Sequence, residues 1–154
     1  PFGICLIDKG GEVGRAAVPH GVGTLATITN WEMEQLGILM ITAQGGRRFR
    51  IIETQVGDGH LLEGTVELLA EAGPTPLPQE RERLLPLLQR IVGDLGPERI
   101  PEPHRYDDAE WVGYRITEVL PIQNLAKQKL LELDDPLARL EILEKYLSQR
   151  KLLG

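Results

Sequence analysis

The hydrophobic and polar residues of this chain change their period near the middle of the sequence. Up to about Leu69, short apolar or alternating runs are separated by Gly, Asp and Asn, a pattern typical of strands. The predicted strands cover residues 2–8, 23–31, 38–43, 48–55 and 61–69. Their number and spacing favour a small barrel or sandwich.

After residue 78 the apolar residues recur at intervals of three and four, which predicts amphipathic helices. The first carries an apolar stripe from Leu84 to Leu95. In the first helix, Pro86 predicts a kink or a late start and Gly96 marks the end. The second helix is expected to start at Asp107 and Asp108. The third should have Pro121 in its first turn, and the fourth should be capped by Asp135 and begin at Pro136. Such narrow stripes need partners, so we expect the four helices to pack together or against the β half.

Residues 73–78 separate the two patterns. The segment contains Pro74, Pro76 and Pro78, which lack a backbone donor and fix the backbone dihedral φ. We therefore predict an α+β protein with a β subdomain over residues 1–72, a Pro-rich linker over 73–78 and a helical bundle over 79–154.

Composition places the chain among ordinary globular proteins and disfavours generic binding of nucleic acid. Hydrophobic residues make up 42% and charged residues 26% of the 154, and the net charge is −6. Up to Ala70 there are five Lys/Arg and eight Asp/Glu, which leaves twelve of the 17 and fifteen of the 23 for the rest. A domain that binds nucleic acid usually has a basic face. Because the sequence has one cysteine, no leader and no membrane-length apolar run, we expect a cytoplasmic protein with no membrane partner.

The sequence contains no recognisable catalytic motif. Ser148 is the only serine and has no base placed near it by a motif, while Cys5 lies in an apolar run where a thiol is usually inert. No phosphate-binding loop of the type GxxxxGK[ST] occurs, and His20, His60 and His104 are about forty residues apart without ligand spacing. We expect no enzyme activity, no metal and no cofactor.

Residues 43–53 (AQGGRRFRIIE) pose the main functional alternative. Gly45-Gly46 lies between two apolar runs, and a double glycine suits a tight hairpin turn. Arg47, Arg48 and Arg50 with Phe49 form a candidate patch that could hold a phosphate and stack a base. On so acidic a chain, a hairpin with one solvent-exposed face is the better interpretation.

The same residues carry a resemblance to a known family. Residues 22–28 (VGTLATI), a turn around Leu36-Gly37, and residues 44–51 (QGGRRFRI) follow one another, and residues 128–132 (QKLLE) precede Asp135 and Arg139-Leu140. This order resembles the N-terminal domain of Lon proteases over nearly the whole chain. The double glycine before Arg47 and the Pro-rich linker depart from the family pattern and leave the specificity of the surface open.

The resemblance implies a PUA-like β pseudobarrel followed by a helical bundle. It also implies a further strand and helix upstream of Pro1, and a domain that contacts substrates while separate ATPase and protease modules do the chemistry. Neither module is present between Pro1 and Gly154, so we expect either an excised fragment or, more in keeping with the end of the sequence, a stand-alone protein.

Trp31, Met33 and Leu36 are the candidate peptide-binding residues. If exposed, this group would suit adaptable contacts with apolar polypeptide segments. The alternative is that Trp31 closes the mouth of the barrel. The expected function is non-enzymatic recognition of unfolded or misfolded polypeptides, with a separate ATP-dependent protease as a further partner. The other candidate functions are a PUA-like RNA-binding module and a purely structural or assembly domain.

The missing catalytic residues yield a direct prediction. The purified protein should neither hydrolyse ATP nor cleave unfolded casein, since it lacks a phosphate-binding loop and an activated hydroxyl. Phosphate release and gel assays check this. Turnover that persists through repurification and disappears with a point substitution in this chain would contradict it.

Overall fold

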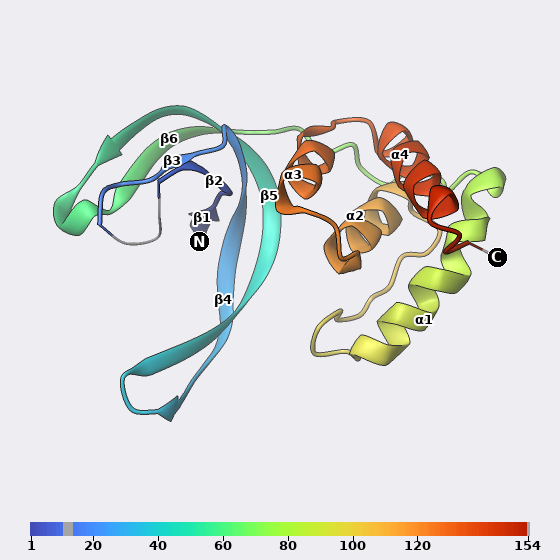
Figure 1. The fold of residues 1–154 in the computed structure, drawn as a ribbon, viewed down its shortest axis with the longest axis horizontal. Coiled ribbons are helices and arrows are strands. Elements are labelled where there is room, and N and C mark those ends of the chain that lie inside the picture. The colour runs from blue at the N-terminus through green and yellow to red at the C-terminus, as the bar shows by residue number, and fades with distance from the viewer. Residues whose placement is uncertain (11–13, 154) are drawn as a thin grey trace. The chain divides into compact units, whose positions relative to one another are not determined.

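The computed structural model describes residues 1–10 and 14–153 and divides the chain into two compact units (Figure 1). Residues 1–71 form a unit of antiparallel strands, and residues 72–154 form a helical unit. The predicted α+β class is therefore confirmed. Among the described residues, no helix is long and apolar enough to cross a membrane.

The β unit contains one four-stranded and one two-stranded antiparallel sheet. The larger sheet has the order β1-β4-β5-β6, and the smaller one pairs β2 with β3. The strands are β1 (Phe2–Ile4), β2 (Ile7–Lys9), β3 (Val18–Pro19), β4 (Val22–Gln35), β5 (Ile38–Val56) and β6 (Leu62–Leu68), with a short 3₁₀ helix at Asp58–His60 before β6.

The larger sheet is closely packed where β1, β4 and β5 meet. Phe49 on β5 is only 3% exposed and pairs with Gly23 on β4. A Cβ atom added to Gly23 would lie 2.5 Å from Cys5 Sγ, 2.6 Å from the Ile4 carbonyl oxygen and 2.6 Å from Phe49 Cζ. Only glycine fits there, so Gly23 of the GTLA sequence lets the Phe49 ring and the neighbouring backbone approach β4.

Strands β4 and β5 continue well beyond their neighbours as a two-stranded arm, defined here as residues 27–44. β1 pairs with residues 24–26 of β4, and β6 pairs with residues 49–56 of β5. Within the part of the chain that is described, the arm strands pair only with each other, and all residues from 27 to 47 are exposed. Figure 1 shows this ribbon projecting from the rest of the β unit.

The predicted hairpin turn at Gly45-Gly46 is wrong. Both glycines lie inside β5, which runs without a break from Ile38 to Val56. Thr24 pairs with Arg48 and Ala26 with Gly45, so β5 carries one extra residue here, a β-bulge. The turn instead uses Gly37, whose φ of 87° is a conformation that residues with a Cβ atom rarely adopt.

The helical unit has its own apolar core. The helices are α1 (Leu85–Leu95), α2 (Ala109–Val119), α3 (Asn124–Glu132) and α4 (Pro136–Gln149), and a 3₁₀ turn at Gln79–Leu84 precedes α1. The fully buried members of the core include Leu84, Leu88, Val112, Leu140 and Leu147. The late start of α1 near Pro86 is confirmed, and so are the caps: Asp108 accepts from the Glu110 amide, and Asp135 accepts from the Leu137 amide.

The prediction for Pro121 is wrong. The third helix begins at Asn124, and Pro121 instead follows the end of α2. A residue before proline is pushed out of the helical region, and Leu120 accordingly has ψ of 137°. Leu125 on α3 and Leu137 on α4 are exposed.

Residues 73–78, the predicted linker, belong to the helical unit and contact the start of α2. Pro76 forms an isolated β-bridge with Asp108, and the Thr75 amide donates to the Asp108 carboxylate at 3.2 Å. The Leu77 amide donates to the Asp107 carbonyl at 2.9 Å, and its side chain packs on the helical core. The carboxylate of Asp108 therefore joins this segment to the start of α2.

The contacts of Gly23 predict the effect of two glycine substitutions. Gly23→Ala should lower the free energy of unfolding of the β unit by about 1–3 kcal/mol, because the new methyl group overlaps three neighbours. Gly21→Ala is the matched control, since nothing lies within 4 Å of its added Cβ. Urea denaturation followed by the nuclear magnetic resonance signals of β4 measures both. Equal stability of the two variants would contradict this packing.

Candidate functional site

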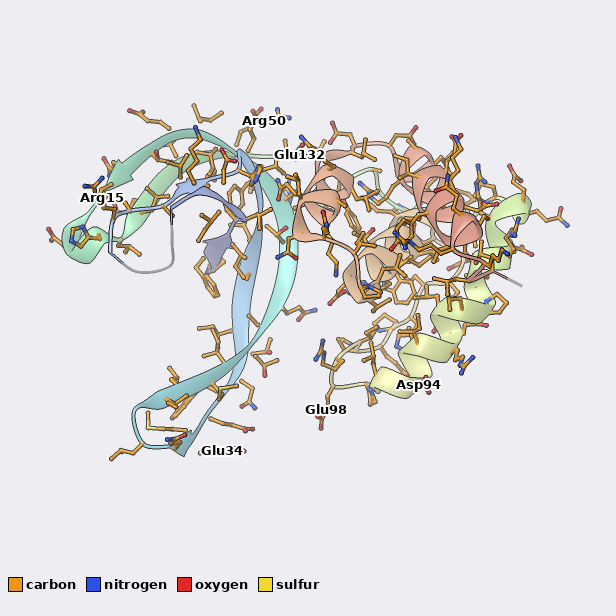
Figure 2. All side chains as sticks on the ribbon, in the orientation of Figure 1. Arg15, Glu34, Arg50, Asp94, Glu98 and Glu132 are labelled. Atoms are coloured by element: carbon orange, nitrogen blue, oxygen red, sulfur yellow. The ribbon has the colours of Figure 1, made fainter. Side chains whose placement is uncertain are left out.

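The arm has one apolar face and one mixed face. Trp31 pairs with Ile41 and Glu32 with Met40, so each pair shares a face. Because side chains alternate along a strand, Met33 and Leu39 lie on the face of Trp31, while Glu34 lies with Glu32. Figure 2 shows side chains projecting along the arm, with Glu34 near its tip.

The three candidate peptide-binding residues are all accessible. Trp31 is 65% exposed, Met33 52% and Leu36 95%. Trp31 and Met33 share the apolar face, whereas Leu36 lies in the two-residue turn between Gln35 and Ile38. Trp31 therefore does not close a barrel. It stands on the exposed ribbon, where a flat aromatic ring and a flexible thioether can contact a partner.

Sequence reasoning missed the neighbouring run on β5. Ile38, Leu39, Met40 and Ile41 are each about half exposed or more. Four consecutive apolar residues put apolar side chains on both faces of a strand, which is typical of a strand covered on both sides. Here neither face is covered by described residues. The missed signal was that this run does not alternate with polar residues as a half-buried strand does.

The charges of the arm are all negative. Glu32 and Glu34 are its only charged residues, and no Lys or Arg occurs between Asn30 and Gly46. The Asn30 side-chain amide donates to Glu32 at 3.2 Å. The arm thus has an apolar face and, opposite to it, a mixed face that carries both carboxylates.

Comparison with known proteins assigns the chain to a family. Residues 1–149 match the family model of the ATP-dependent protease La (LON) substrate-binding domain. The chain belongs to this family. The resemblance noted in the sequence is thereby confirmed, and the arm is a feature of a LON substrate-binding domain.

Two solved structures of Lon N-terminal domains are similar to this chain. The crystal structure of a Lon N-terminal domain protein from Xanthomonas campestris is 32% identical, with a TM-score of 0.75 over 94% of this chain and 75% of that one. The N-terminal domain of a Lon protease from the Mycobacterium avium complex is 22% identical, with a TM-score of 0.60 over 95% of this chain and 77% of the other, and shows the fold alone. Among curated proteins, no sequence matches.

The candidate nucleic-acid patch of this LON substrate-binding domain is divided between core and surface. Phe49 and Arg48 are buried, so the ring is not available to stack on a base. Arg47 donates to the Leu69 carbonyl at 3.1 Å and lies 3.8 Å from a Glu71 carboxylate oxygen. Arg50 is exposed. The four residues therefore do not form one open surface.

Other reactive groups include a partly buried thiol, Cys5, and a histidine close to a carboxylate. Burial raises the pKa of the Cys5 thiol, which keeps it protonated and a weak nucleophile. His20 lies 3.9 Å from Asp8. Over residues 1–10 and 14–153, no three His, Cys, Asp or Glu side chains gather in a way that could hold a metal ion.

The exposure of Trp31 predicts that it contributes little to stability. Trp31→Ala should reduce the free energy of unfolding of the β unit by about 1 kcal/mol or less, since only its pairing with Ile41 is lost. Phe49→Ala, a buried aromatic on the same sheet, should cost about 3–5 kcal/mol or unfold the unit. Urea denaturation compares them, and a large loss for Trp31→Ala would mean that the indole is covered.

Proposed function

We propose that this chain is a non-catalytic module that recognises exposed apolar segments of unfolded or misfolded polypeptides through the apolar face of the arm. Membership of the LON substrate-binding domain family supports recognition of protein substrates in general. The observation that carries the finer proposal is the exposure of Trp31 and Met33 on one face of a ribbon that, among residues 1–10 and 14–153, has no further strand paired with it.

The residues of this face suit polypeptides of varied sequence. Large apolar patches that remain exposed commonly mark sites of interaction. Met33 can adapt its shape to different side chains, and Trp31 offers a large surface with little rotamer entropy to lose. The face contains no base, nucleophile or metal ligand, so binding without chemistry is the activity that it favours. Delivery of bound segments to a separate ATP-dependent protease in the cytoplasm is the setting we propose.

Binding of an uncharged apolar peptide should depend on the arm and hardly on salt. We expect a labelled, uncharged peptide rich in Leu, Ile and Val to bind, with an affinity that changes about twofold or less between about 50 and 200 mM salt, because apolar burial is not screened. Trp31→Ala and Met33→Ala should each weaken binding about tenfold, because each removes much of a buried apolar side chain. Fluorescence anisotropy measures these affinities.

Two controls separate this proposal from its alternatives. Leu125→Ala removes a leucine of α3 that is about as exposed as Met33, and it should leave peptide affinity unchanged. Arg50→Ala removes a cation of the alternative nucleic-acid patch and should also have no effect. Salt-sensitive binding of RNA that is lost in Arg50→Ala, with no peptide binding, would replace the proposal by the RNA-binding alternative.

A further inference from the structure

The outer edge of β5 in the arm has no partner strand among the described residues. β6 pairs with β5 only as far as Phe49, and the Leu69 amide then donates to the Arg48 carbonyl at 2.9 Å before the chain leaves the sheet. Residues 38–44 therefore pair with β4 on one side only. An exposed edge of this kind is a template for another strand, and proteins usually protect it with charges, proline or a bulge.

Two hydrogen bonds show which backbone groups this edge presents. The Thr42 carbonyl accepts from the Thr29 hydroxyl on β4 at 3.2 Å, so the backbone groups of Thr42 face β4. Because the direction alternates along a strand, those of Leu39 and Ile41 face outward. The Arg48 carbonyl faces outward, toward β6. Strict alternation from Thr42 would turn it toward β4, but the extra residue of the bulge between Gly45 and Arg48 reverses the alternation, so the two hydrogen bonds are consistent.

The side chains beside this edge are those of a central strand. Leu39 is 55% and Met40 61% exposed, and they lie on opposite faces. A strand added here would therefore find apolar neighbours on both faces, and no charged residue protects the run from Ile38 to Gln44. The sequence of this run is typical of a strand with neighbours on both sides, whereas in the sheet it has a neighbour on one side only. A further strand added at the edge would remove this mismatch.

We infer that β5 binds its polypeptide ligand by strand addition along residues 38–44, with the outward N–H and C=O groups of Leu39 and Ile41 forming the new ladder. This inference rests on the proposed function and specifies its mode: backbone hydrogen bonds hold the extended segment, and its side chains set which segments are preferred.

The charge of the arm selects the chemistry of the occupant. Glu32 lies on the strand next to the edge, opposite Met40, at about two strand spacings, or roughly 10 Å, from an added strand. Lys or Arg in that strand can approach the carboxylate by extending its side chain. A second copy of the chain would bring only further glutamates in its arm. The occupant is therefore an extended segment of another polypeptide in which apolar residues alternate with Lys or Arg.

Hydrogen exchange of single amides tests the mode directly. In the free protein, the Met40 and Thr42 amides should be protected and those of Leu39 and Ile41 should exchange fast. A peptide of alternating Val and Lys should bind and then protect Leu39 and Ile41. The same peptide N-methylated on alternate residues should not bind, because it lacks the donors, and one with Glu in place of Lys should bind more weakly.

A matched pair of variants separates the backbone from the side chain. Ile41→Ala keeps the outward N–H, whereas Ile41→Pro removes it without removing a donor to β4. We expect Ile41→Pro to bind the Val-Lys peptide about tenfold more weakly than Ile41→Ala. Continued protection of the Met40 and Thr42 amides shows that the arm is intact in each variant. If Ile41→Pro disrupts the arm, the exchange measurement on the natural sequence decides.

Three results would overturn the inference. Peptide binding that needs Trp31 but leaves the Leu39 and Ile41 amides unprotected would refute strand addition and leave the proposed function standing. Protection that grows with protein concentration in the absence of peptide would assign the edge to a second copy. Failure of every peptide to bind would overturn both the inference and the proposed function.

Discussion

The pairing of β4 with β5 is the constraint on which the β unit depends. It runs from Val22 opposite Arg50 to Gln35 opposite Ile38 and joins two different environments. At one end it places Phe49 over Gly23, where no side chain larger than hydrogen fits. At the other end it holds the arm, where the described part of the chain provides no third strand. An isolated hairpin is marginal in water, so the packed end supplies the stability that the exposed end lacks.

This division explains why the apolar residues of the arm remain exposed. A ribbon with Trp31, Met33 and Leu39 on one face would normally be covered or would aggregate. Its acidic residues, Glu32 and Glu34, lie on the opposite face and keep the arm solvated without covering the apolar side chains. Exposed apolar side chains disfavour solubility in a purely structural element, whereas an element that binds other polypeptides needs them.

Much of the fold could be predicted from the sequence because its signals are local. The change of hydrophobic period separates strands from helices, and the caps at Asp108 and Asp135 need only a carboxylate beside the first helical amides. The turn predicted at Gly45-Gly46 failed because the conformation there depends on a strand distant in sequence. Gly45-Gly46 has turn composition, but pairing with β4 keeps it extended as part of a bulge.

The candidate site could be predicted only in part, because its exposure depends on contacts distant in sequence. Trp31 and Met33 were identified by residue type, but their exposure follows from where β1 and β6 stop pairing, which no local pattern records. Phe49 was a candidate for stacking on a base until its contact with Gly23 placed it in the core. The run from Ile38 to Ile41 was identified as a strand, and its open edge is visible only in the sheet.

The central claim is that the arm is where this LON substrate-binding domain meets polypeptide. Chemical-shift mapping of the isotope-labelled protein with an unfolded polypeptide tests it most directly, because it reports every residue at once. We predict that the shifts concentrate on residues 28–44, on both the Trp31 face and the β5 edge, while the helical unit stays unchanged. Shifts centred on the helices, or on Arg47 and Arg50 with the arm unaffected, would contradict the account.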